Sequence, residues 1–413
     1  MKVLVFGFHD VPPGYIGGGW IRTMEILRRG KRHGVEYFMI ENKPSLRDVY
    51  GIDYKGIEVE VVGIPANRFH RDLAMIKAIR RGIELARDED FDLILSPNEQ
   101  HMCVLPAYFT SKLTGIPWTA ILQLAPVYWS LAPDKIWRCT SRFRDVYAWF
   151  RYACECSTRH AVTATVVSSL LFRAARSSPM LAVGQGIVED MRIIDAKVET
   201  VLLDPSYAVD LNRIPSSDQP KEFDGLYAAP QKGVFDLLEM WSYVVDRRPE
   251  ATLAIVGKAS RSTLALIEKT AEELGLRKNL RIQLDERGKS QEEIWSFMKR
   301  SKIYVYPSRV DSWALTVAEA LACGLPVVAY DIPAIRYAHG NCPAVQLVQV
   351  DKARDFASKC LQLLSDQELL GRTSLQGTAY ARKNYDWDKV VEAEKQAYMK
   401  VIRASAQTSM QVE

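Results

Sequence analysis

Residues 308–331, SRVDSWALTVAEALACGLPVVAYD, carry two acids among mostly small and apolar residues, with seven residues between Asp311 and Glu319. The segment before them, KIYVYPS, is typical of a buried strand. Apolar residues from about Leu315 to Cys323 have helical spacing, and the Gly and Pro that follow are stop signals. The stretch therefore predicts a strand, a loop with one acid, a helix with the other, and a second strand, PVVAYD.

The same alternation of strands and helices continues through the chain. The first half holds KVLVFGF, VEYFMIE, FDLILSP, WTAILQL and TATVVSS, and the second holds FDGLYAA, ATLAIVG, LRIQLD, IYVYPS and PVVAYD. Amphipathic stretches such as STLALIEKTAEELG lie between them. Near-continuous apolar strands that alternate with such helices indicate parallel sheets covered on both faces. Two series of this kind predict an α/β protein with two doubly wound domains.

A polar segment with three prolines, DPSYAVDLNRIPSSDQPKEFDG, separates the two series. We expect one domain over residues 1–205 and a second over residues 206–382. Residues 383–413 are expected to form a helix followed by a tail.

Composition restricts the class of protein. The 413 residues are 48% hydrophobic and 25% charged, as in soluble globular proteins, and a net charge of +4 gives no reason to expect a nucleic-acid partner. The seven cysteines are odd in number and scattered, which favours reduced thiols over a disulfide framework or a zinc site. The N-terminal segment lacks a signal-peptide pattern, so we expect a cytoplasmic protein.

Ligands of open α/β sheets bind outside the carboxyl ends of the strands. After the first strand, Gly17, Gly18 and Gly19 would let the backbone approach a ligand closely, and the next helix offers N–H groups to an anion. A flexible turn is the alternative. Lys232 follows the strand FDGLYAA and would reach phosphate oxygens, or it is a solvated surface lysine.

The two acids of the opening stretch have two interpretations. Asp311 and Glu319 would both face one elongated ligand, with the backbone N–H groups near Thr316 at the positive end of the helix. Alternatively, Asp311 caps the helix and Glu319 is solvated or ion-paired. Three further polar side chains, His9, His101 and Gln123, are candidates for hydrogen bonding or acid–base catalysis, each with a structural role as the alternative.

Taken together, these segments resemble the retaining glycosyltransferases of family 4, also called glycosyl transferases group 1. The resemblance rests on GGGW, VVSS, YAVD, APQKG, LAIVG, IYVYPSR, DSWALTVAEALACGLPVVAYD and YDWDKVVEAEKQAY, in that order. It implies the GT-B fold, in which two Rossmann-like domains face each other across a cleft. Residues 1–205 would be the acceptor-side domain and residues 206–382 the nucleotide-sugar-binding domain, and the helix of residues 383–413 would pack back on the N-terminal domain. It also implies transfer of a sugar from a nucleotide-diphosphate sugar to a glycan, lipid-linked or polysaccharide acceptor, with retention of configuration and no obligatory cofactor or metal.

The resemblance also implies roles for the candidate residues. Glu319 would hold the ribose hydroxyls, and Asp311 would meet the transferred sugar. Lys232 and the amides of Leu315 and Thr316 would neutralise the diphosphate, and the loop of Gly17, Gly18 and Gly19 would close over it. His9 and Gln123 are the candidates for catalysis on the N-terminal side.

Five positions depart from the family pattern. Asp311 stands where the family usually has glutamate, and Tyr227 stands where it has a cation. Ser312 and Ala314 replace two glycines, and Gln123 lies near the expected place of a histidine. These departures motivate a rival hypothesis, a non-catalytic nucleotide-sugar-binding or scaffolding subunit. A third is another activity of the same fold, such as epimerisation of a nucleotide sugar.

Residues 127–156 interleave aromatic residues with four arginines, Arg138, Arg142, Arg144 and Arg151. One interpretation is a peripheral contact with the anionic inner face of a membrane, where a lipid-linked acceptor would be met. The other is a core-facing aromatic stripe with solvated arginines.

Overall fold

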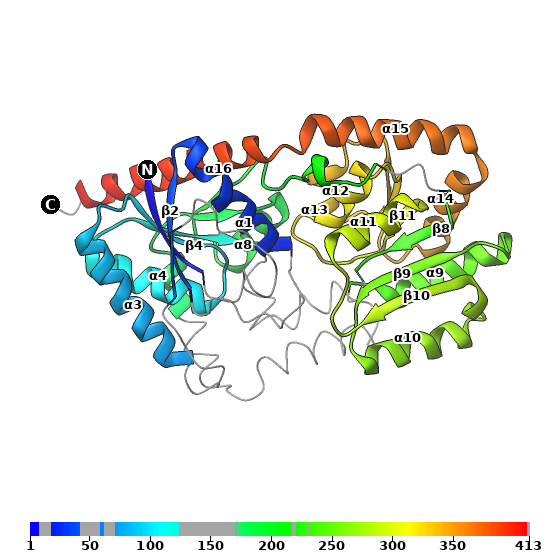
Figure 1. The fold of residues 1–413 in the computed structure, drawn as a ribbon, viewed down its shortest axis with the longest axis horizontal. Helices are drawn as coiled ribbons and strands as arrows, with labels where there is room; N and C mark the ends of the chain where they lie inside the picture. Colours follow the sequence, from blue (N-terminus) through cyan, green and yellow to red (C-terminus); the bar gives the residue numbers. More distant parts are fainter. Residues whose placement is uncertain are drawn as a thin grey trace. The chain divides into compact units, whose positions relative to one another are not determined.

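The computed structural model describes residues 1–7, 18–41, 58–61, 71–123, 170–171, 173–216, 220–229 and 232–410. These residues form two compact units. Unit 1 comprises the described residues up to Ser206 together with those from Trp387 onward, and unit 2 comprises the described residues of Tyr207–Asp386. Each unit is built around its own parallel sheet (Figure 1).

The sheet of unit 1 has the strand order β3-β2-β1-β4-β5-β6-β7, and all its pairs are parallel. Its strands are β1 (Lys2–Phe6), β2 (Glu36–Glu41), β3 (Glu58–Val61), β4 (Leu93–Ser96), β5 (Trp118–Leu122), β6 (Met180–Ala182) and β7 (Thr200–Leu202). Its α-helices are α1 (Gly18–Gly30), α3 (Arg71–Asp88), α4 (His101–Thr114), α8 (Gln185–Ile194) and α16 (Trp387–Met410). Helices α3 and α4 lie side by side (Figure 1).

Helix α16 is joined to the rest of unit 1 by a buried ion pair. It packs against α1 and β5. Arg22 of α1 is fully buried, donates from Nε to the carbonyl oxygen of Ser206 at 2.7 Å, and pairs with Glu394 of α16. A buried charge needs such partners, because an unpaired one costs several kcal/mol.

Unit 2 has a sheet of the order β10-β9-β8-β11-β12-β13, again entirely parallel. Its strands are β8 (Phe223–Tyr227), β9 (Leu253–Lys258), β10 (Leu280–Asp285), β11 (Ser301–Tyr306), β12 (Val327–Tyr330) and β13 (Val345–Val348). Its α-helices are α9 (Val234–Arg247), α10 (Arg261–Glu273), α11 (Gln291–Lys299), α12 (Leu315–Ala322), α13 (Pro333–His339), α14 (Ala353–Ser365) and α15 (Gln367–Asn384). The predicted α/β class with two doubly wound parallel sheets is confirmed.

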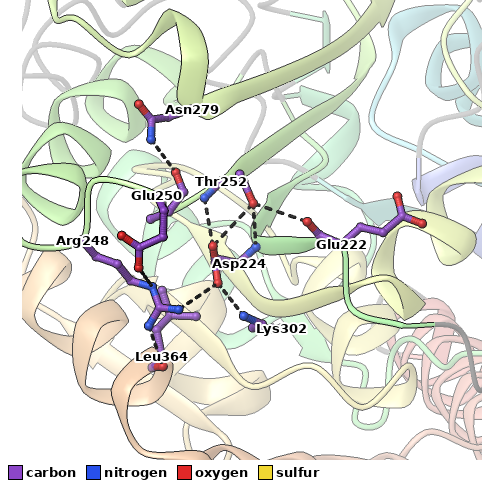
Figure 2. Close-up of polar contacts among 9 residues, drawn as sticks. Glu222, Asp224, Arg248, Glu250, Thr252, Asn279, Lys302 and Leu364 are labelled. Atoms are coloured by element: carbon purple, nitrogen blue, oxygen red, sulfur yellow. Dashed lines mark hydrogen bonds and ion pairs between the residues drawn. The ribbon is translucent and has the colours of Figure 1, made fainter.

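A charged network fixes the amino end of the β8 strand (Figure 2). Asp224 is buried, and its carboxylate accepts hydrogen bonds from Lys302 Nζ at 2.7 Å and from the backbone N–H of Thr252 at 3.0 Å. Arg248 lies 3.8 Å from the same carboxylate and donates to the carbonyl oxygen of Leu364. Because Thr252 precedes β9 and Lys302 lies in β11, the network holds three neighbouring strands in register.

No helix within the described ranges is long and apolar enough to cross a membrane.

Candidate functional site

The order of the strands in unit 2 places two loops next to each other. Strands β8 and β11 are neighbours in the sheet although 73 residues separate Tyr227 from Ser301. Helices leave in opposite directions from such a pair, which opens a crevice at the carboxyl ends of the strands. Lys232 follows β8 and Asp311 follows β11.

Gly233 brings the two loops into contact. It has a φ of 107°, a conformation that only glycine adopts without strain, and it caps the amino end of α9. A Cβ atom here would lie 2.4 Å from the carbonyl oxygen of Pro307, just past β11. This close approach of two backbones positions the neighbouring Lys232 beside the loop that carries Asp311.

Asp311 and Lys232 form an ion pair at this point. The Nζ atom of Lys232 lies 2.5 Å from Oδ2 of Asp311, and the Tyr306 hydroxyl donates to the same oxygen. The Asp311 side chain is only 6% exposed, whereas that of Lys232 is 35% exposed. Burial opposes ionisation of Asp311, but the Lys232 ammonium and the two hydrogen bonds hold its pKa below the usual range.

The second oxygen of the Asp311 carboxylate shapes the loop that follows. Its Oδ1 atom accepts from the backbone N–H groups of Ser312, Trp313 and Ala314 at 2.7, 3.3 and 3.1 Å. Asp311 therefore caps the residues before α12 rather than the helix itself. Ala314 has a φ of 62°, a left-handed conformation at a family glycine position, and α12 begins at the next residue.

Leu315 and Thr316 are the first two residues of α12. The N–H groups at these positions have no partner within a helix, and the helix dipole adds partial positive charge there. The amino end of α12 follows β11, and Lys232 follows the neighbouring strand β8. Both carry positive charge that would stabilise a bound anion.

Glu319 lies on α12 and is 4% exposed. Its Oε1 atom accepts a hydrogen bond from Nε2 of Gln291 at the start of α11. Burial raises the pKa of Glu319 to about 7, and the hydrogen bond from Gln291 opposes this rise only in part. An acid buried in this way is costly to ionise, and hydroxyl donors from a ligand would stabilise its charged form.

In unit 1, a second group of predicted residues meets at the ends of β4 and β5 and the start of α1. Gln123 follows β5, and its Nε2 atom donates to the carbonyl oxygens of Pro97 at 2.9 Å and Gly19 at 3.2 Å. Its backbone N–H donates to Oε2 of the buried Glu99 at 2.9 Å. A Cβ atom at Gly19 would lie 1.4 Å from Oε1 of Gln123, so a larger residue here would displace the Gln123 side chain from these hydrogen bonds. Gln123 therefore links the start of α1, at Gly19, to the segment after β4, at Pro97.

The remaining predicted residues have other placements. His9 and Gly17 lie outside the described residues, as do segment 127–156 and the expected strand TATVVSS, whereas Gly18 is the first residue of α1. His101 is an exposed residue at the start of α4. Tyr227 is completely buried and its ring lies 6.4 Å from that of Tyr306.

Sequence reasoning missed three residues that contact the predicted ones, Glu99, Gln291 and Tyr306, and it also missed His339, which contacts Trp313 in the loop after Asp311. Tyr306 is the last residue of β11, so the rule that ligand residues follow strands could have included it. The contact between Gln291 and Glu319 spans 28 residues and depends on how α11 packs beside α12. Within the ranges that the structure describes, no group of three or more His, Cys, Asp or Glu side chains is arranged to hold a metal ion.

Comparison with known proteins supports the family resemblance. The family model named Glycosyl transferases group 1 matches residues 228–380, which cover most of unit 2. The resemblance to the glycosyl transferases group 1 that the motifs predict is thus confirmed over this part of the chain.

Two curated relatives illustrate the similarity. The chain is 29% identical over 208 residues to phosphatidyl-myo-inositol mannosyltransferase of Mycobacterium tuberculosis, a match covering 49% of this chain and 53% of that protein. It is 28% identical over 181 residues to D-inositol 3-phosphate glycosyltransferase of Streptomyces bingchenggensis, covering 42% of this chain and 39% of that protein. The chain thus matches about half the length, or less, of these relatives.

Solved structures extend the similarity to the whole fold. Sucrose-phosphate synthase from Thermosynechococcus elongatus superimposes with a TM-score of 0.71 at 15% identity, covering 98% of this chain and 99% of that one. Anabaena HepE in complex with UDP and glucose gives 0.68 at 16% identity, covering 97% and 100%. The fold is therefore the two-domain, Rossmann-like GT-B fold.

Proposed function

We propose that the protein is a glycosyltransferase that moves a sugar from a nucleotide-diphosphate sugar to an acceptor, with retention of the anomeric configuration. The observation that carries the proposal is the arrangement after β8 and β11. There, the half-buried ammonium of Lys232 pairs with Asp311, and the amino end of α12 follows directly.

The chemistry of the transfer needs stabilisation of charge. As the anomeric carbon separates from the diphosphate, negative charge grows on the leaving group and positive charge on the sugar ring. Lys232 and the amides of Leu315 and Thr316 are the groups we assign to the leaving diphosphate. Gly233 brings Lys232 beside the loop that carries Asp311, and the Asp311 carboxylate holds the turn that precedes these amides.

Two carboxylates are assigned to the two ends of the donor. Asp311 contacts hydroxyls of the transferred sugar, and binding of the diphosphate draws Lys232 from its ion pair towards phosphate. Glu319 accepts hydrogen bonds from the ribose hydroxyls, which replace or join the amide of Gln291. Both roles follow from the preference of buried carboxylates for hydrogen-bond donors.

Unit 1 is assigned to the acceptor. Its glycine loop, including Gly18 and Gly19, is the segment we expect to approach the donor, with Gln123 as the residue that holds it. The names of the mannosyltransferase and inositol phosphate glycosyltransferase relatives favour a glycan, polysaccharide or lipid-linked acceptor. A contact of segment 127–156 with an anionic membrane surface and a cytoplasmic location at its inner face belong to the same proposal.

The test is acceptor-dependent release of nucleoside diphosphate from a panel of nucleotide sugars. We expect Lys232→Ala and Glu319→Ala each to remove most of this release while both proteins remain folded by circular dichroism. Lys278→Ala is the matched control, since this exposed lysine lies near the amino end of β10. Wild-type rates in both site variants would refute the assignment, and donor binding without any transfer would favour the non-catalytic subunit.

A further inference from the structure

His339 is a buried histidine to which neither the family motifs nor the proposed chemistry gives a role. It is the last residue of α13 and is 0% exposed. Its Nε2 atom lies 2.7 Å from the carbonyl oxygen of Trp313, and its Nδ1 atom lies 2.7 Å from the hydroxyl of Tyr385. Trp313 is in the loop between Asp311 and α12.

The two contacts determine how the imidazole is protonated. A carbonyl oxygen only accepts hydrogen bonds, so Nε2 carries the proton, and Nδ1 then accepts from the Tyr385 hydroxyl. Burial lowers the pKa of His339 to about 4, although the hydrogen bond to Trp313 opposes this. The ring is therefore neutral at neutral pH, in one tautomer.

This histidine restrains the same loop that the Asp311 carboxylate restrains, through a different backbone group. Asp311 binds the N–H groups of Ser312, Trp313 and Ala314, and His339 binds the carbonyl group of Trp313. The imidazole also packs edge-on against the indole of Trp313, with ring centroids 4.6 Å apart. The left-handed Ala314 follows at once, so these restraints hold a strained turn in place.

The same cluster reaches both ends of the segment Tyr207–Asp386 of unit 2. Tyr207, the first residue of this segment, stacks on Trp313 with ring centroids 5.1 Å apart. Tyr385 lies one residue before the end of the segment, contacts His339 through its hydroxyl, and has its ring centroid 5.6 Å from that of Trp313. Both ends of this segment are thus in contact with the loop between Asp311 and α12.

We propose that His339 is a positioning residue: its imidazole fixes the loop from Asp311 to Ala314 in the geometry that binds the donor, and joins that loop to Tyr385 near the end of unit 2. The effect of this restraint on donor binding rests on the proposed function. The restraint of the loop is a property of unit 2 alone and is measured without any ligand.

The experiment compares His339→Phe, His339→Gln and Tyr385→Phe with the wild-type protein. Phenylalanine retains a ring but loses both hydrogen bonds, whereas glutamine retains an N–H group for the Trp313 carbonyl. Tyr385→Phe removes only the hydroxyl that donates to Nδ1. Tyr380→Phe is the matched control, because it removes a hydroxyl from the neighbouring ring, 5.9 Å from that of Tyr385.

Hydrogen exchange of the full chain, followed by mass spectrometry, reports on the loop. In His339→Phe we expect exchange in the peptide over residues 311–317 to become about tenfold faster, as for the loss of one hydrogen bond. Tyr385→Phe should show a smaller increase, while His339→Gln and Tyr380→Phe remain near the wild-type rate. Unchanged exchange in both His339→Phe and Tyr385→Phe would overturn the proposal.

Calorimetric titration with UDP then separates this inference from the proposed function. We expect the affinity for UDP to fall about tenfold in His339→Phe and to be restored in large part by His339→Gln. Faster exchange with undiminished UDP affinity would overturn the positioning role. Faster exchange in a protein whose wild type binds neither UDP nor any other nucleoside diphosphate would support the restraint and overturn the proposed function.

Discussion

Replacing Glu319 by glutamine removes a carboxylate that the folded protein is expected to ionise only at considerable cost. The pKa of about 7 lies about 2.5 above the ordinary value of 4.5, and at about 1.36 kcal/mol per pKa unit the difference is on the order of 3 kcal/mol. Because the pKa is raised on folding, the contribution of this group is fully present below pH 4.5 and is lost as the pH rises through 7. The free energy of unfolding of Glu319→Gln, compared with that of the wild type, should therefore be higher at pH 8 than at pH 4.5.

Calorimetric unfolding at both pH values measures this effect, with the transition of unit 2 resolved from that of unit 1. Subtracting the wild-type values from those of Glu319→Gln cancels the contributions of the other titrating groups. We expect the variant to gain on the order of 3 kcal/mol between pH 4.5 and pH 8, whereas the exposed Glu268→Gln should gain nothing comparable. If the free energy of unfolding of unit 2 differs between Glu319→Gln and wild type by the same amount at both pH values, the reasoning is refuted.

Three further predictions concern the backbone and the charged network. Gly19→Ala should lower the unfolding temperature of unit 1 because its Cβ would collide with Gln123, whereas Gly371→Ala, at an exposed helical position with open space, should stabilise unit 2 by about 1 kcal/mol. Ala314→Gly should stabilise unit 2 by roughly 0.5–1 kcal/mol in the same assay, since glycine relieves the left-handed strain; a loss would contradict it. Asp224→Asn should lower the free energy of unfolding by about 2–3 kcal/mol, because Lys302 and Arg248 would lose the buried carboxylate that pairs with them; an unchanged unfolding free energy would show that the network contributes little.

The sequence predicts the long, apolar strands well and the short ones poorly. Strands β1 and β9 are near-continuous apolar runs, and both were expected. Strands β6 and β7 have three residues each, too few to show a pattern, and β3 alternates Glu58 and Glu60 with valine. Such segments become strands because the neighbouring strand offers them hydrogen bonds.

For the site, the rule that ligand residues follow parallel strands selected Lys232 and Asp311, and the structure places them in an ion pair. The partners of a buried group are harder to predict. Gln291 beside Glu319 and His339 beside Trp313 depend on helix packing and on contacts 26 to 28 residues apart in the chain. No periodicity in the sequence encodes those distances.

The central claim is that unit 2 binds a nucleoside diphosphate through Lys232 and the start of α12. The most direct measurement is the unfolding temperature in the presence of UDP, GDP or ADP, for wild type, Lys232→Ala and the control Lys278→Ala. A ligand of the native state raises this temperature by mass action. We predict a rise with at least one nucleotide in the wild type and the control, and its loss in Lys232→Ala; no rise with any nucleotide, or an equal rise in all three proteins, would contradict the claim.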